Sequence, residues 1–304
     1  MRLNYFLFVN LLFSSVWAVA GASEPGTPVR IVVTAEATGK HSPPTLSARD
    51  VSVTSGKDNL PVIDLVPASG ANARLQLFLL MDDSSTTEIG TQIGDLKQFV
   101  QALPATAEIA IGYMRNGTTN RVQEFTTDHA TAAAKIRLPL GAPGANASPW
   151  FSVADLIKHW PETEARREIL VVSDGIDRYY EGGADNPYVN AAIEQAQRKG
   201  VVVNSIYWTG AGHYGHSYWR INWGQSYLSQ IADQTGGEQY YQGFGNPVSF
   251  QPFLSNLAAR LENQYLLTFR AKPQNKAGWL RIRAHTEVAN VEVVAPSQVW
   301  VPAS

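Results

Sequence analysis

The chain has 304 residues, a formal net charge of -2 at pH 7 and a hydrophobic fraction of 44%, and it contains no cysteine. This length has room for one large domain and one smaller domain of an ordinary globular protein. The lack of cysteine excludes disulfides, thiolate metal sites and cysteine nucleophiles, and the absence of a basic stripe argues against nucleic acid as a partner.

The first 22 residues are predicted to be a secretory signal peptide. Arg2 precedes an apolar run from Tyr5 to Val19, and small residues follow in Ala18-Val19-Ala20 and in Ala20-Gly21-Ala22. A positive start, a short apolar run and an A-x-A site are typical of a cleaved export signal. The alternative is a retained anchor, but the run is shorter than the ~20 residues that a spanning helix needs. We therefore expect a secreted, periplasmic or cell-envelope protein of bacterial type, without membrane insertion of the mature chain.

Short β-rich runs flank the middle of the chain on both sides. They are Val29–Ala35, Val51–Val53 and Pro61–Val66 before it, and Tyr265–Ala271, Trp279–Ala284 and Val291–Val294 after it. Because such short strands cannot bury a core alone, we expect the N-terminal β segment (residues 23–72) to pair with the C-terminal one (residues 264–304). Together they would form one small accessory sheet or sandwich.

Residues 73–263 alternate between strand and helix patterns. Leu75–Met81 and Ile169–Ser173 are continuous apolar runs, as expected for strands buried on both faces. The further strands are expected at Glu108–Met114, Arg121–Thr126, Val201–Trp208 and Glu238–Tyr241, and the helices at Ile89–Leu103, Ser152–Trp160, Pro187–Lys199, Gln225–Gln234 and Pro252–Asn263. Repeated strand–helix units predict an α/β fold with a doubly wound, mostly parallel, Rossmann-like sheet.

Oxygen-bearing side chains follow the two buried strands. Asp82, Ser84 and Thr86 form a D-x-S-x-T arrangement after the first strand, and Asp174 ends the second. Ser148 lies in a loop between the two strands and offers a third hydroxyl. Ser152, at the start of the helix that follows this loop, is the alternative to Ser148. Ligands of doubly wound folds bind at the carboxyl ends of the strands, and hydroxyl and carboxylate oxygens suit a hard cation. The sequence therefore predicts one metal site.

These residues give the chain its resemblance to a von Willebrand factor A-type domain with a metal-ion-dependent adhesion site. The family has D-x-S-x-S/T after its first strand, a Thr in a middle loop and an Asp after its fourth strand; here Ser148 stands in place of that Thr. The resemblance covers about residues 74–264 and implies a bound Mg²⁺, or Mn²⁺ or Ca²⁺. It also implies a protein partner that presents an Asp or Glu carboxylate to the ion. The flanks resemble those of secreted bacterial A-domain proteins.

A simpler interpretation exists for each motif. An Asp and a Ser after a strand are often only a helix N-cap, and Asp174-Gly175 is also typical of a turn. A short motif is a hypothesis that its structural context has to support. Here both motifs end buried strands of one α/β unit, which favours the metal site.

Two loops beside the predicted site are rich in aromatic residues, namely Asp177–Pro187 and Thr209–Gly224. Tyr, Trp and Arg dominate interface hot spots. The candidate partner-binding residues are Tyr179, Tyr180, Tyr214, Trp219, Arg220 and Trp223. The alternative is a lid of aromatic side chains that pack inward. His213 and His216 lack a clear third ligand, so zinc is not favoured.

Catalysis is not expected. Position 84 is Ser, so the second carboxylate of an aspartyl phosphoryl-transfer site is missing, and the chain has no G-x-S-x-G elbow, P-loop or G-x-G-x-x-G after a strand. The expected function is metal-dependent protein binding or adhesion. The alternatives are a structural interaction module with a vestigial metal site and, less favoured, a metal-assisted hydrolase.

Overall fold

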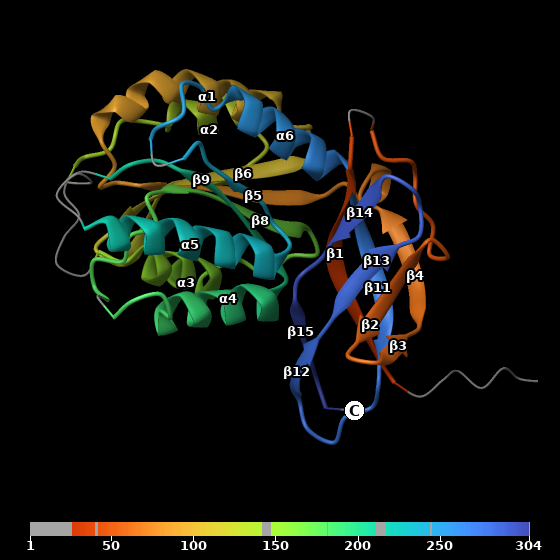
Figure 1. Cartoon of the computed structure of the whole chain (residues 1–304). Helices are drawn as coiled ribbons and strands as arrows, with labels where there is room; N and C mark the ends of the chain where they lie inside the picture. Colours follow the sequence, from red (N-terminus) through yellow and green to blue (C-terminus); the bar gives the residue numbers. More distant parts are fainter. Residues whose placement is uncertain are drawn as a thin grey trace, which may run out of the picture.

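The computed structural model describes residues 26–39, 42–141, 147–180, 182–210, 217–243 and 245–303. An α/β domain and a smaller β domain lie side by side (Figure 1). The predicted signal peptide lies outside the described residues. In the part of the chain that the structure describes, no helix is both long and apolar enough to cross a membrane.

The α/β domain is built on a six-stranded sheet in the order β10-β9-β8-β5-β6-β7. Its strands are β5 (Leu75–Asp82), β6 (Ala107–Arg115), β7 (Thr118–Thr126), β8 (Arg166–Ser173), β9 (Val201–Tyr207) and β10 (Gln239–Tyr240). All neighbouring pairs are parallel except β6 and β7, so only the edge strand β7 is antiparallel. The prediction of a doubly wound, mostly parallel sheet is confirmed.

Helices cover both faces of this sheet, in two layers that Figure 1 shows above and below it. They are α1 (Ile93–Ala102), α2 (His129–Ala134), α3 (Pro149–Lys158), α4 (Pro187–Lys199), α5 (Tyr218–Thr235) and α6 (Gln251–Glu262), with 3-10 turns η1 (Gly70–Asn72) and η2 (Thr87–Gln92). Leu77 and Leu79 of β5 pack with α1, α2 and α6, whereas Phe78 and Leu80 pack with α3, α4 and α5. Alternate residues of a strand face opposite sides, so β5 is apolar throughout.

The β domain is assembled from both ends of the chain. Its strands are β1 (Thr27–Ala37), β2 (Val51–Ser55), β3 (Asp58–Leu60), β4 (Val62–Pro67), β11 (Gln264–Ala271), β12 (Gly278–Arg281), β13 (Arg283–Thr286), β14 (Val291–Val294) and β15 (Gln298–Val301). β11 lies between β1 and β4, and β2 lies between β13 and β3. The prediction that the two flanks form one accessory β domain is therefore confirmed. One apolar core, which includes Val33, Leu267 and Phe269, holds these sheets together.

Polar contacts and one stacked arginine join the two domains. The Ser297 amide donates to the Gln234 carbonyl at 3.1 Å, and the Gln298 side chain donates to Gln197 Oε1 at 2.8 Å. The Arg198 guanidinium of α4 lies 3.7 Å from the ring centroid of Trp300. A cation over an indole ring is attracted to it, so this contact ties α4 to β15.

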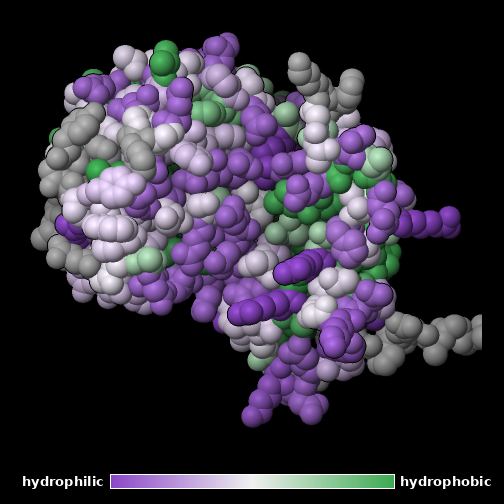
Figure 2. Space-filling view, viewed as in Figure 1, coloured by the Kyte–Doolittle hydropathy of each residue, from purple (hydrophilic) through white to green (hydrophobic). Residues whose placement is uncertain are grey.

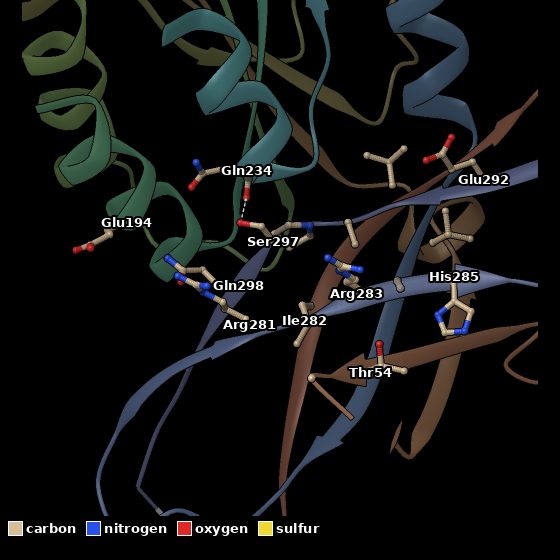
Figure 3. A pocket seen from close by; sticks show the side chains of 16 residues that line it. Thr54, Glu194, Gln234, Arg281, Ile282, Arg283, His285, Glu292, Ser297 and Gln298 are labelled. Atoms are coloured by element: carbon tan, nitrogen blue, oxygen red, sulfur yellow. Dashed lines mark hydrogen bonds between the residues drawn. The ribbon is translucent and has the colours of Figure 1, made fainter. Parts of the chain in front are cut away.

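A cavity of about 1330 Å³ lies beside this junction, between the ends of α4 and α5 and the strands of the β domain (Figure 3). Its labelled lining residues are mostly polar or charged, with Arg281 and Arg283 from the β domain and Glu194 from α4. Figure 2, viewed as in Figure 1, shows that the visible face of the α/β domain is mainly hydrophilic and that the strongest hydrophobic colouring gathers over the β domain.

A buried carboxylate lies at the start of β8, where the two domains meet. Glu168 is fully buried and accepts hydrogen bonds from Gln264 Nε2 at 2.6 Å and from Asn204 Nδ2 at 2.7 Å. The guanidinium of Arg166 in turn contacts Gln264 Oε1 and donates to the Leu261 carbonyl at 3.0 Å. Burial raises the pKa of Glu168 to about 7, although Gln264, Arg166 and Asn204 oppose the shift.

This raised pKa predicts a pH-dependent stability. The folded chain holds the Glu168 proton more tightly than the unfolded chain does, so this stabilisation is complete at low pH and is lost as pH rises from about 4.5 through about 7. We expect the free energy of unfolding of the wild type to fall, relative to Glu168→Gln, by up to about 3 kcal/mol between pH 4.5 and pH 8. Urea unfolding of both proteins across this range measures the difference, and parallel pH profiles would contradict the prediction.

Candidate metal centre

The two motifs meet because β5 and β8 are adjacent and parallel. Asp82 ends β5, and Asp174 directly follows β8, which is the fourth strand of the α/β domain. The Ser173 hydroxyl at the end of β8 donates to Asp82 Oδ2 at 2.9 Å. Parallel strands place their carboxyl ends at the same edge of the sheet, so two stretches of chain that lie far apart in sequence share one site.

Asp82 is buried and shaped by its neighbour Ser84. Both the amide and the hydroxyl of Ser84 donate to Asp82 Oδ1, at 2.8 and 2.6 Å. The N-cap interpretation does not hold for Asp82, because the next helical turn, η2, begins only after Thr86. Burial raises the pKa of Asp82 and the nearby charge of Asp174 raises it further, whereas the guanidinium of Arg178 opposes this.

Ser148 precedes the first residue of α3 but does not cap the helix. Its side chain makes no capping hydrogen bond, and its buried hydroxyl has no partner among the described residues. The alternative residue, Ser152, is already engaged, since its hydroxyl donates to the Thr118 carbonyl at 3.0 Å. Buried hydroxyls in native proteins are normally bonded, and the Ser148 oxygen remains available to contact a ligand.

Asp82, Ser84, Ser148 and Arg178 are among the residues that line one small cavity of about 10 Å³. A space of this size holds about one water-sized particle. Ser152 lines it as well, so one carboxylate and three serine hydroxyls surround a space that suits a hard cation keeping part of its water shell. The donor set therefore fits a single Mg²⁺ or Mn²⁺ ion better than an ion that requires a full cage of protein oxygens.

Two of the predicted ligands are differently engaged. The Thr86 hydroxyl accepts a hydrogen bond from Trp208 Nε1 at 3.2 Å and does not line the cavity. Asp174 accepts from the Ile176 amide at 2.9 Å and from Arg178 Nη2 at 3.0 Å. The structure thus brings Asp82, Ser84 and Ser148 to the cavity, while Arg178 holds Asp174.

Sequence reasoning missed two features of this edge. One is the Arg178–Asp174 pair: Arg178 belongs to the aromatic loop Asp177–Pro187, and no periodicity in a loop indicates which carboxylate an arginine reaches. The other is Asp83, which accepts from Arg137 Nη1 at 2.7 Å and from the Leu140 amide at 2.9 Å. Asp83 therefore anchors a neighbouring loop and does not line the cavity.

The predicted partner-binding residues divide between exposed and packed positions. The exposed fractions are 49% for Tyr179 and 65% for Trp219. Tyr180 packs edge-on against Tyr188, and Trp223 packs against the core beneath α3 to α5. Arg220 is half-buried near the start of α5. Tyr214, like His213 and His216, lies outside the described residues.

Helix α5 begins at Tyr218, seven residues before the predicted start at Gln225, and Gly224 lies inside it. A Cβ at Gly224 would lie 2.5 Å from the Asp174 carbonyl oxygen. This glycine is therefore a close-packing residue, not the helix boundary that the sequence suggested. At the facing position, Gly175 has a φ of +69°, a conformation that favours glycine. Close approach of α5 fixes the Asp174–Gly175 backbone.

We expect Gly224→Ala to lower the free energy of unfolding by about 1 to 3 kcal/mol, because the added methyl group overpacks this contact. The matched control is Gly94→Ala in α1, where a Cβ would meet nothing within 4 Å. The control should leave stability unchanged or raise it by up to about 1 kcal/mol, since Ala has the higher helix propensity. Thermal unfolding of the two variants tests this, and equal melting temperatures would contradict it.

No family model matches the sequence, and no curated protein matches it either. Solved structures resemble it in fold. An aerotolerance-related membrane protein from Bacteroides fragilis is 14% identical with a TM-score of 0.45, over 62% of this chain and 98% of that one. BatB from Bacteroides thetaiotaomicron is 13% identical with a TM-score of 0.43, over 62% and 97%. The ArnB paralog VWA2 from Sulfolobus acidocaldarius is 11% identical with a TM-score of 0.41, over 90% and 76%.

The α/β domain has a von Willebrand factor A-like fold. The strand order of the sheet and the motif residues at the carboxyl ends of β5 and β8 give the domain this likeness. A shared fold does not transfer a function, which has to be argued from the site.

Proposed function

We propose that the chain is an exported protein-binding module that holds one divalent cation and, through it, a carboxylate of a partner protein. The observation that carries the proposal is the orphaned Ser148 hydroxyl, which lines the same small cavity as Asp82 and Ser84. Mg²⁺ or Mn²⁺ is preferred over Ca²⁺, because few protein oxygens reach the cavity.

Asp82 would supply the negative charge for the ion, and the hydroxyls of Ser84 and Ser148 would supply neutral oxygens. A bound dication would provide a strong electrostatic attraction for an oxygen of the partner's Asp or Glu side chain. Among the described residues, Asp82 is the one carboxylate that lines the cavity, so these residues would neutralise only part of the ion's charge. An anionic partner group would complete the neutralisation.

Exposed aromatic side chains support a protein partner. Tyr179, which follows the cavity-lining Arg178, and Trp219, at the start of α5, are large aromatic side chains that remain exposed, and aromatic residues are enriched at interfaces. Tyr179 packs against Phe151 at 5.0 Å between ring centroids, and Phe151 packs against Tyr188 at 4.7 Å. A surface aromatic held by its neighbours loses little conformational freedom when a partner binds.

Substitutions that each remove one serine hydroxyl test metal binding. We expect Ser148→Ala to weaken Mn²⁺ binding about tenfold, the size of one lost contact to a charged group. Ser152→Ala is the comparison with the alternative ligand: Ser152 also lines the cavity, but its hydroxyl donates to the Thr118 carbonyl, so its loss should change the affinity less than the loss of the Ser148 hydroxyl does. Calorimetric titration of the mature protein with Mn²⁺ measures both. If Ser148→Ala binds Mn²⁺ as tightly as the wild type, Ser148 is not a ligand.

The Arg178–Asp174 ion pair favours a second function, that of a structural interaction module, because the guanidinium already neutralises one carboxylate of the site. In this case the metal site is vestigial and other surfaces bind the partner. Asp82→Ala separates the two functions in a capture experiment with envelope extract, in the presence of Mg²⁺ or of a chelator. Metal-dependent capture by the wild type that Asp82→Ala abolishes supports adhesion through the ion, whereas capture that survives both the substitution and the chelator supports the second function.

A further inference from the structure

The cavity already contains a protein cation. The Arg178 side chain is only 13% exposed, lines the cavity with Asp82 and Ser84, and donates from Nη2 to Asp174 Oδ2 at 3.0 Å. The Asp174 side chain itself is fully buried. Buried charges are stable only when they are paired, so this guanidinium compensates the acidic edge of the sheet in the absence of any ion.

The pair is closely enclosed. The Arg178 amide donates to the Ala147 carbonyl at 3.0 Å, which fixes its backbone beside the Ser148 loop. On the other side lies Gly210, where a Cβ would come within 2.2 Å of Asp174 Oδ2 and 2.6 Å of Arg178 Nη2. A glycine at this position leaves just enough room for the ion pair.

Electrostatics makes the guanidinium and a divalent ion competitors. Like charges repel strongly in a buried site of low dielectric constant. While Asp174 Oδ2 accepts a charged hydrogen bond from Arg178, its negative charge is largely neutralised, so it binds a metal ion less strongly. One of the two cations has to move away before the other can use both carboxylates.

We propose that Arg178 is an internal competitor of the divalent ion: its guanidinium holds Asp174 in the ion-free protein, and tight ion binding requires this contact to open. The inference rests on the proposed function, because it concerns the same site. The loop backbone around Arg178 is held in place, since Asp177 accepts hydrogen bonds from the amides of Tyr179 and Tyr180 at 2.9 and 3.1 Å. Opening is therefore a movement of the Arg178 side chain alone.

Arg115 provides a matched control. It lines the same cavity and carries the same charge, but it is exposed and forms no ion pair among the described residues. Arg115→Gln therefore changes the net charge beside the cavity as Arg178→Gln does, without releasing Asp174. Exposed charges are largely screened by salt, so its effect on ion binding should be small.

The test is calorimetric titration of the mature wild type, Arg178→Gln and Arg115→Gln with Mn²⁺. We expect Arg178→Gln to bind Mn²⁺ roughly tenfold more tightly than the wild type or better, and Arg115→Gln to remain within about threefold of it. Equal or weaker binding by Arg178→Gln overturns the competition and leaves the metal site standing. No binding by any of the three proteins overturns both the competition and the proposed function.

A second measurement needs no variant. Crystal structures of the wild type with and without Mn²⁺ should differ in the distance between Arg178 Nη2 and Asp174 Oδ2. The proposal expects a bonded pair without the ion and a separated pair with it. A guanidinium that still donates to Asp174 beside a bound ion overturns the proposal.

Discussion

The parallel pairing of β5 with β8 places both acidic residues of the candidate metal centre. Both strands are buried on both faces, so their register is fixed by packing, and their carboxyl ends bring Asp82 and Asp174 to one edge. Two buried carboxylates near each other are unfavourable unless other groups compensate them. The hydroxyls of Ser84 and Ser173, the Ile176 amide and Arg178 perform this compensation. What this edge of the sheet can bind therefore depends on which positive group compensates the carboxylates of Asp82 and Asp174.

The same strand connects this edge to the β domain. β8 begins with Arg166 and Glu168 and is followed at its other end by Asp174. The partners of Arg166 and Glu168 are Leu261 and Gln264, which lie where α6 passes into β11. Only Asn263 separates α6 from β11, so no flexible linker lies between the domains there. A buried network of hydrogen bonds makes a specific junction, because loss of one partner leaves another buried polar group unpaired, which is costly. The accessory domain is consequently held in a defined position relative to the site.

The surface next to the cavity combines exposed aromatic side chains with a held backbone. Phe151 and Tyr188 support Tyr179 from beneath, and Asp177 holds the amides of the loop. Such an arrangement reduces the entropy lost on association. The aromatic residues divide between the two expected arrangements. Tyr179 and Trp219 are exposed, as a partner-binding surface requires, whereas Tyr180 and Trp223 pack against their own domain, as in a lid.

The fold class follows from the amino-acid pattern alone, because continuous apolar runs and strand–helix alternation report burial directly, and so does the pairing of the two flanks in a β domain. The same pattern locates oxygen-bearing residues at the ends of the two central strands. The partners of these residues depend on how the chain packs in three dimensions: Arg178 holds Asp174, Thr86 accepts a hydrogen bond from Trp208, and the hydroxyl of Ser148 has no partner among the described residues. The start of α5 was misplaced for the same reason. A glycine lowers helix propensity in any sequence window, and its use for close approach becomes visible only when another backbone lies against it.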